Sequence, residues 1–340
     1  MTATKEAIAQ VLNGVIDPNT GKGLQDSGEI ASVLPGAVII ELGYPAKSQI
    51  ELIKKAAEDA LRAAGIDSEV EVRQNIRAHK VRSTLRVLPN VKNIIAVSSG
   101  KGGVGKSFVT GAIATELARH GHKVGVLDAD ITGPSIPKMF GMSGRHVHAL
   151  GNLMLPEISE HGVKVMSSNL LLQNETDPVL WRGPVIAGAI RQFWSETSWG
   201  PIDYLLVDMP PGTGDVALTV FQSLPVDGIV IVTSPQDLVS MIVAKAVNMA
   251  EKNVPILGIV ENMSYIECPD CGKKIEVFGK SKLPEVAERY NLDILGQLPI
   301  NPALAEACDK GEVETALPDG MLPKAVSAVE AITPHETDEA

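Results

Sequence analysis

One short segment of the chain has the residue types and the spacing of a loop that binds phosphate. Residues 100–107 read Gly-Lys-Gly-Gly-Val-Gly-Lys-Ser, between an apolar segment and a segment with helical periodicity. Glycines allow backbone N–H groups to turn toward phosphate oxygens, and the N-terminus of a helix adds a partial positive charge. Lys106 is therefore expected to contact the β- and γ-phosphates of a nucleoside triphosphate, and Ser107 to ligate Mg²⁺. The nucleotide-binding residues predicted in this loop are Gly100, Lys101, Gly102, Gly103, Val104, Gly105, Lys106, Ser107 and Phe108.

Carboxylates follow two other apolar segments that are expected to be strands. Asp128 and Asp130 come after one of them, and Asp208 ends the other. Carboxylates at the ends of strands beside a phosphate loop can bind the waters of Mg²⁺ or position an attacking water. Asp128, and also Asp215 further on, are equally well explained as helix caps.

Two of the three cysteines are spaced as ligands of one metal site. Cys268 and Cys271 form a C-x-x-C followed by Gly272, so both thiolates can converge while N–H groups point at the sulfurs. A tetrahedral sulfur site needs four thiolates, which a second copy of the chain related by a two-fold axis would supply. A bridging iron–sulfur cluster and a structural zinc ion both fit, whereas Pro269 and Gly272 favour a turn over a thioredoxin-like redox helix. Cys308 is expected to be a small packing residue.

The elements that must position these residues fall into four segments. Residues 1–76 have the pattern helix, strand, strand, helix, strand, which predicts a small α/β domain. Residues 77–92 are mixed and basic and are interpreted as a linker, although continuation of the first domain explains them nearly as well. Residues 93–333 alternate short Val- and Ile-rich segments with helical ones, which predicts a mostly parallel sheet covered by helices on both faces. Residues 334–340 are polar and are predicted to be a disordered tail.

The expected elements can be given by their residues. Strands are expected at 28–33, 37–42, 70–72, 94–98, 123–127, 163–166, 204–208, 229–233, 256–260 and 294–298. Helices are expected at 5–15, 49–64, 106–120, 188–194 and 238–252. Because ligands of a parallel sheet bind at the carboxyl ends of its strands, the phosphate loop and the carboxylates are expected to meet there.

Composition excludes several classes of function. The net charge of -11 argues against a nucleic-acid surface and against polybasic attachment to anionic lipid. The longest apolar segments, such as 228–232, have the length of a strand and are too short to span a membrane, and the first residues lack the pattern of a signal peptide. Three cysteines in 340 residues are typical of a reducing compartment. We therefore expect a cytoplasmic protein without nucleic-acid or membrane partners.

The combination of motifs resembles the Mrp/ApbC family of iron–sulfur cluster carriers, within the MinD/ParA-like group of P-loop ATPases. The resemblance rests on GKGGVGKS, on DADITGPSIP, on WRGP at Trp181, on VDMPPGTGD and on ENMSYIECPDCG. It implies an ATP-hydrolysing homodimer that uses Mg²⁺ and holds a cluster between the C-x-x-C pairs of its two chains. A 4Fe–4S cluster is favoured over a 2Fe–2S cluster, with a cluster-assembly scaffold as source and apo iron–sulfur proteins as clients.

The resemblance also implies roles for single residues. Lys101 would reach across the dimer to the partner's nucleotide, as a catalytic residue together with Lys106. Asp208 would be the Walker B acid, and Asp130, the third catalytic residue, would orient the hydrolytic water. Gly212 would give the second switch its mobility and an N–H for the γ-phosphate. Asn262 would face the adenine ring, with a turn-forming asparagine as the alternative.

The sequence departs from the family pattern in two places. Residues 1–76 resemble the metal–sulfur-cluster assembly domain of such proteins, but 42–47 have no thiol, so docking of a scaffold or partner is the preferred role. Phe108 stands where relatives have a small hydroxyl residue.

Two alternative functions stay open. A MinD/ParA-like positioning ATPase would need a basic or amphipathic attachment surface, which the acidic residues 333–340 do not provide. A zinc-stapled ATPase or a chaperone for another metal is compatible with the thiolates.

Overall fold

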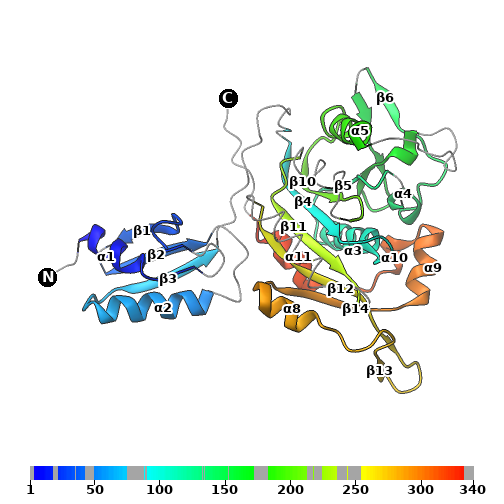
Figure 1. Ribbon diagram of the computed structural model, residues 1–340. Helices are drawn as coiled ribbons and strands as arrows, with labels where there is room; N and C mark the ends of the chain where they lie inside the picture. Colours follow the sequence, from blue (N-terminus) through cyan, green and yellow to red (C-terminus); the bar gives the residue numbers. More distant parts are fainter. Residues whose placement is uncertain are drawn as a thin grey trace. The chain divides into compact units, whose positions relative to one another are not determined.

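The computed structural model describes most of the chain and divides it into two compact units. The described residues are 4–17, 22–34, 36–42, 50–74, 88, 90–131, 133, 135–151, 153–171, 183–212, 217, 224–235, 243 and 254–332. The units are Met1–Arg77 and Ala78–Ala340 (Figure 1). Most of the predicted linker at 77–92, nearly all of the predicted helix at 238–252 and the whole predicted tail at 334–340 lie outside the described residues.

The N-terminal unit has the predicted order of helix, strand, strand, helix and strand. Its middle strand pairs antiparallel with the first strand and parallel with the third. The buried residues of the second helix recur every fourth position, which places them on one side of the helix facing the sheet. The elements are α1 (Lys5–Leu12), β1 (Ile30–Leu34), β2 (Ala37–Leu42), α2 (Ile50–Ala63) and β3 (Glu69–Gln74).

The N-terminal unit contains a buried carboxyl group, Glu29, that lies near a second carboxyl group, Asp17. Glu29, just before β1, is 5% exposed, and its Oε2 accepts a hydrogen bond from Ser27 Oγ at 2.8 Å. Burial raises the pKa of Glu29 to about 7, against the effect of the Ser27 bond and with the help of the nearby Asp17. The folded unit therefore favours the neutral form of this side chain.

We expect Glu29→Gln to stabilise the N-terminal unit in weak alkali but not in acid. Below the unfolded-state pKa of about 4.3 the wild-type side chain is protonated in both states, so the variant gains nothing. As the pH rises toward 7 the folded state keeps a proton that the unfolded state has lost, so wild-type stability falls, by on the order of a few kcal/mol, and then levels off. Hydrogen exchange of the β2 amides in the intact chain measures the difference at about pH 4 and about pH 8.

Glu71→Gln on β3 is the control for this experiment, because it removes the same charge from an exposed position. A gain for Glu29→Gln that is equally large at both pH values would mean that packing, and not the proton, is responsible.

The second unit is built on a mostly parallel sheet, as predicted. Along the sheet the strands follow the order β13-β12-β11-β4-β10-β5-β9-β8, and β14 also pairs with β12. Only the β8–β9 and β12–β13 pairs in the described sheet are antiparallel. The strands are β4 (Val91–Ser99), β5 (Val124–Asp128), β8 (Glu157–Ile158), β9 (Lys164–Met166), β10 (Ile202–Asp208), β11 (Gly228–Thr233), β12 (Ile256–Glu267), β13 (Lys274–Ile275) and β14 (Ile294–Pro299).

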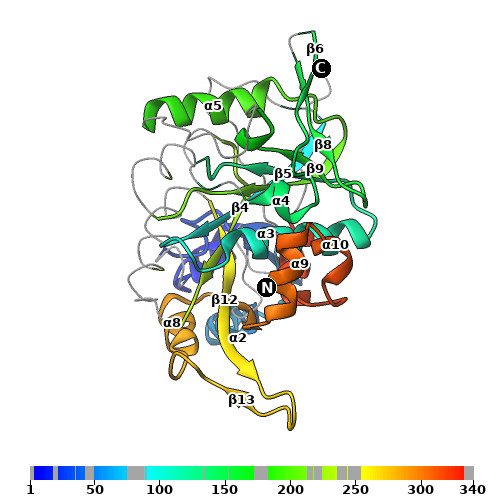
Figure 2. The ribbon, with the colours of Figure 1, turned by 90° about the vertical axis from the view of Figure 1, so that its right-hand side faces the viewer.

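Helices cover both faces of this sheet. α3 (Lys106–Arg119) packs on β4, β5 and β10, and α11 (Pro323–Glu330) packs beside it on β12 and β14. On the other face α5 (Gly183–Ser195) and α8 (Leu283–Tyr290) join one hydrophobic core with the alternate residues of the strands. Figure 2 shows β4 and β5 between α5 and α3. No helix within the described residues is long and apolar enough to cross a membrane.

Most strands differ from their predicted bounds by one or two residues, and the differences at β4 and β12 bear on the site. β4 begins at Val91, inside the predicted linker, because Val91 is buried and pairs with Ile202. β12 continues well past the predicted end at residue 260, as far as Glu267. The sequence also gave no prediction for the short hairpin of β6 (His148–Leu150) and β7 (Leu153–Leu155), or for α4 (Ile136–Met139), α9 (Pro302–Lys310) and α10 (Val313–Ala316).

Candidate functional site

The glycine-rich loop connects the end of β4 to the first residue of α3. Gly103 and Gly105 have φ angles of 82° and 81°, the left-handed region that favours glycine. A Cβ atom at Gly105 would also overlap the side-chain amide of Asn262, whereas a Cβ at Gly103 would meet nothing. The loop therefore has the shape of a phosphate cradle, and one of its glycines is required by a contact with β12.

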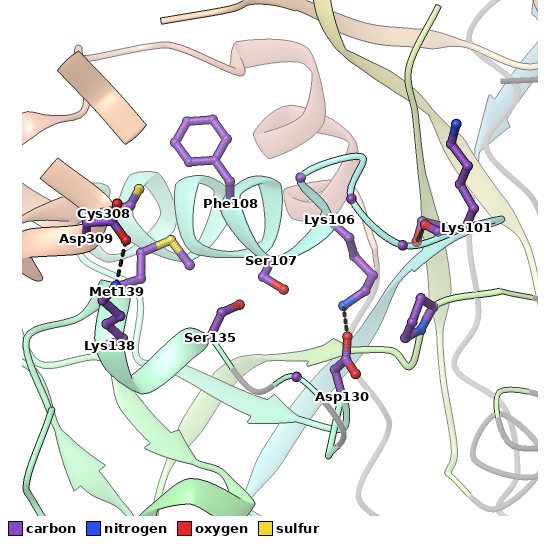
Figure 3. Close-up of a pocket in the computed structure, with 16 residues that line it drawn as sticks. Lys101, Lys106, Ser107, Phe108, Asp130, Ser135, Lys138, Met139, Cys308 and Asp309 are labelled. Carbon is purple, nitrogen blue, oxygen red and sulfur yellow. Dashed lines mark hydrogen bonds and ion pairs between the residues drawn. The ribbon is translucent and has the colours of Figure 1, made fainter. Parts of the chain in front are cut away.

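A cavity of about 340 Å³ opens above this loop (Figure 3). The loop and the start of α3 form one side, and α4 and α9 form the other. The lining includes Phe108 and also Ser135, Lys138, Met139, Cys308 and Asp309, which sequence reasoning did not assign to the nucleotide site. Lys101 is exposed at the edge of the cavity, and its side chain points away from Lys106.

Lys106 carries a buried ammonium group between two carboxylates. Its Nζ lies 2.8 Å from Asp208 Oδ2 and 3.7 Å from Asp130 Oδ2. These ion pairs lack the angles of a hydrogen bond, and the described residues give this nitrogen no other partner. An ammonium group with unused donors at the base of a glycine cradle fits the oxygens of a phosphate chain.

Asp208 is fully buried and also receives two hydroxyl groups from α3. Ser107 Oγ donates to Oδ2 at 2.6 Å, and Thr110 Oγ1 donates to Oδ1 at 2.7 Å. The Ser107 and Asp208 oxygens together are the hard donors that Mg²⁺ prefers, so the predicted pair fits that ion. Thr110 was missed, although its position one helical turn after Lys106 places it on the same side of α3.

Asp128 is a second fully buried carboxyl group of the site. It ends β5, and its oxygens accept hydrogen bonds from the backbone N–H of Asp130 at 3.2 Å and from Ser167 Oγ at 3.1 Å. Its alternative role as a helix cap is wrong, because the following helix α4 begins only at Ile136. Burial, followed by the charge of Asp208, raises the pKa of Asp128 to about 8. The neutral acid therefore prevails at neutral pH, which limits the repulsion within the carboxylate cluster.

Asn262 and Gly212 connect the loop to its surroundings. Asn262 Nδ2 donates to the carbonyl oxygen of Val104 at 3.0 Å, and Oδ1 accepts from the N–H of Met263 at 2.9 Å. Met263 has a φ of 59°, so the asparagine also supports a left-handed residue within β12. The Gly212 N–H donates to Ser99 at 2.9 Å, whereas Asp215 lies outside the described residues.

Cys268 and Cys271 lie in the turn between β12 and β13. The N–H of Cys268 donates to the carbonyl of Lys273, and the N–H of Gly272 donates to the carbonyl of Cys268, both at 2.9 Å. Hydrogen bonds from the backbone N–H groups of Asp270 and Cys271 lower the pKa of the Cys268 thiol. Cys271 is exposed. Within the described residues no group of three or more His, Cys, Asp or Glu side chains could hold a metal ion, so this pair has no further ligands in its own described chain.

Cys308 lies apart from this pair, on α9 at the wall of the nucleotide cavity. It is half-buried, and burial raises the pKa of its thiol. The neighbouring Asp309 forms an ion pair of 2.6 Å with Lys138, which ties α9 to α4 (Figure 3). A neutral thiol in a wall between two helices agrees with the packing role expected for Cys308.

Together the fold and the site define a P-loop NTPase. A family model described as NUBPL iron-transfer P-loop NTPase matches residues 90–332. A second model, described as iron-sulfur cluster assembly protein, matches residues 5–72. The chain belongs to the NUBPL iron-transfer P-loop NTPase family, which confirms the resemblance seen in the motifs.

Individual relatives agree with this assignment. The iron-sulfur cluster carrier protein of Clostridium perfringens is 52% identical over 241 residues, which are 68% of this chain and 84% of the relative. The protein of the same name from Deinococcus radiodurans is 39% identical over 335 residues, or 95% and 93% of the two chains. A solved nucleotide-binding protein in complex with ADP, from Archaeoglobus fulgidus, is 43% identical with a TM-score of 0.62 over 69% of this chain and 96% of that chain.

The contact between Gly105 and Asn262 can be tested by substitution. Gly105→Ala and Gly103→Ala both place a Cβ on a left-handed residue, which costs about 1–2 kcal/mol. Only the first also meets the amide of Asn262, so we expect it to lower the free energy of unfolding of the nucleotide-free protein by roughly 1–2 kcal/mol more. Denaturant unfolding monitored by circular dichroism measures both variants.

A double-mutant cycle separates the contact from general strain. In an Asn262→Ala background Gly105→Ala should lower the free energy of unfolding no more than Gly103→Ala does. The cost of Gly103→Ala itself should be the same in both backgrounds. Equal losses for the two glycine variants in the wild-type background would argue that β12 does not press on the loop.

Proposed function

We propose that this protein binds and hydrolyses ATP, and that it carries an iron–sulfur cluster between two copies of the chain for delivery to apo-proteins. Membership of the family supports the carrier role. The observation that carries the proposal is that one strand, β12, connects the phosphate loop to the cysteine pair. Asn262 on this strand is bonded to the loop, and Cys268 follows the last residue of the same strand.

The middle of β12 is held firmly beside the residue that contacts the phosphate loop. The buried carboxylate of Glu261 accepts hydrogen bonds from Ser264 Oγ at 2.7 Å, from Ser281 Oγ at 2.8 Å and from Gln297 Nε2 at 3.0 Å. These donors come from β12 itself, from the segment before α8 and from β14. Because these bonds prevent β12 from deforming around Glu261, a displacement of the loop would be passed along the strand to the cysteines.

The nucleotide site supplies the groups that hydrolysis needs. Phosphate oxygens would compete with the carboxylates for Lys106, which leaves Asp130 free to orient a water molecule. Mg²⁺, when bound, neutralises charge on the phosphates, and the oxygens of Ser107 and Asp208 are the donors that fit it. Because nucleotide and cluster then bias the same strand, each changes the affinity for the other.

The second copy of the chain completes both sites in this proposal. The Cys268–Cys271 pair provides two thiolates, half of a tetrahedral sulfur set, and a 4Fe–4S cluster is favoured over a 2Fe–2S cluster. Lys101, exposed at the edge of the cavity, would contact the nucleotide of the partner and stabilise the charge that develops on the γ-phosphate. The N-terminal unit, without a thiol, would dock a scaffold or a client.

We expect iron and acid-labile sulfide in matching amounts in the anaerobically purified wild-type protein, and neither in Cys271→Ala. Elemental analysis for iron and zinc, together with a sulfide assay, measures this directly. Cys308→Ala is the matched control: it removes a thiol that lies in the wall of the other site, so the cluster should remain. Zinc in place of iron, or iron that survives the loss of Cys271, would support a zinc-stapled ATPase instead.

The role of Lys101 across the dimer predicts complementation between two inactive variants. Lys101→Ala and Asp130→Asn should each reduce ATP hydrolysis by roughly a hundredfold or more. In a mixed dimer one site combines an intact Asp130 with the partner's intact Lys101, so an equimolar mixture should recover about a quarter of the wild-type rate. Phosphate release measures the rate, and separate proteins at the same total concentration are the control. If Lys101 acted on its own nucleotide, mixing would restore nothing.

A further inference from the structure

The tip of the β12–β13 hairpin exposes large apolar side chains next to the cysteine pair. Ile266 is 37% exposed, Ile275 49%, Val277 48% and Phe278 37%. The hairpin projects from the edge of the sheet (Figures 1 and 2). Four exposed apolar side chains on and directly after one short hairpin are unusual for a surface that stays in water.

Strand geometry places two of these residues on the same face as the first cysteine. Ile266 pairs directly with Ile275, so both side chains lie on one face of the hairpin. Cys268 is two positions after Ile266, and its N–H continues the ladder to Lys273, so by alternation it belongs to that face as well.

Two charged residues of the hairpin ladder lie on the opposite face. Glu267 pairs with Lys274, and the ammonium group of Lys274 lies 4.2 Å from the centre of the Tyr265 ring. A cation–π contact of this kind keeps Lys274 folded against its own chain. The face with Cys268 therefore carries both isoleucines, with Lys273 opposite Cys268 toward the turn, and the face with Lys274 is charged.

We propose that the face formed by Ile266 and Ile275 is the contact through which a second copy of this chain closes around the shared cluster. The inference rests on the proposed function and adds the surface that makes the dimer. The incomplete ligand set supports a second copy as the occupant, because the described chain offers no third ligand beside Cys268 and Cys271. In a two-fold contact each residue near the axis meets a copy of its own patch. Two thiolate pairs that share one cluster therefore bring the two apolar faces together.

This contact would form an apolar interface between the two chains beside the cluster. The isoleucines would exclude water from the inner side of the cluster, and the cluster would hold the two chains in place. Loss of the apolar contact should therefore weaken the dimer and expose the cluster, without a change in the cysteines.

The test uses Ile266→Thr/Ile275→Thr in the full-length protein, with the cluster reconstituted anaerobically and without nucleotide. Thr keeps the β-branched shape and removes the apolar end of each side chain. We expect the dimer dissociation constant, measured by analytical ultracentrifugation, to rise about tenfold or more. Iron loss to a chelator should accelerate by a similar factor.

Ile158→Thr is the matched control. It makes the same substitution at a 52% exposed isoleucine on β8, at the opposite end of the sheet, and should leave both quantities unchanged. Ile266→Val/Ile275→Val keeps the face apolar and should also behave as the wild type. If the double Thr variant has a lowered thermal midpoint, Ile275→Thr alone provides the same comparison.

The remaining outcomes overturn the inference in distinguishable ways. A double Thr variant with the wild-type dissociation constant and iron loss would show that the face does not join the chains. Unchanged dimerisation with slower transfer to an apo-ferredoxin would show that the face recognises clients. Wild-type protein without iron and sulfide would refute the proposed function itself, before any variant is made.

Discussion

The nucleotide site depends on one buried ammonium group among three carboxyl groups. Lys106 is 5% exposed, and it lies among Asp128, Asp130 and Asp208 at the carboxyl ends of two neighbouring strands. One positive charge cannot balance three negative charges away from water, and burial together with the charge of Asp208 drives Asp128 toward its neutral form. Buried ion pairs of this kind contribute little net stability. Their value would be functional, because they hold the lysine at the base of the loop, where phosphate oxygens could replace the carboxylates.

The second constraint is the close approach of β12 to the phosphate loop. Gly105 can adopt its left-handed conformation beside Asn262 only because it has no side chain. The same strand is anchored by the buried Glu261, whose three hydrogen-bond donors come from separate parts of the unit. Two chemical sites far apart in sequence are thus joined by one strand that is fixed in its middle. That arrangement is what a protein needs if nucleotide is to influence a metal site.

The sequence predicted the order of the elements in the N-terminal unit, the main parallel strands of the second unit and the location of the glycine-rich loop. Buried parallel strands are short Val- and Ile-rich runs, and the loop has a fixed spacing, so both are visible without tertiary information. The extension of β12 to Glu267 was not predictable in this way. Its polar residues Glu261, Asn262 and Ser264 look like the end of a strand, and only their partners in the fold make their burial possible. Asp128 was likewise ambiguous, because its partner Ser167 is remote in sequence. The wall of the cavity formed by α4 and α9 escaped notice for the same reason.

The hairpin that carries the cysteines combines a rigid base with a weakly held tip. Its ladder consists of the pairs Ile266 with Ile275 and Glu267 with Lys274 and one further hydrogen bond from Cys268 to Lys273, and a two-stranded ribbon of that length has little stability of its own. The backbone N–H groups of Asp270 and Cys271 stabilise the thiolate of Cys268, whereas Cys271 is exposed to solvent. A permanent metal site would be expected to enclose both ligands. A carrier has the opposite requirement, since its ligands must be reactive enough to capture the cluster and accessible enough for a client to take it. A short hairpin at the edge of a rigid sheet meets both conditions, because the partner chain and the cargo would complete a structure that one chain leaves unfinished.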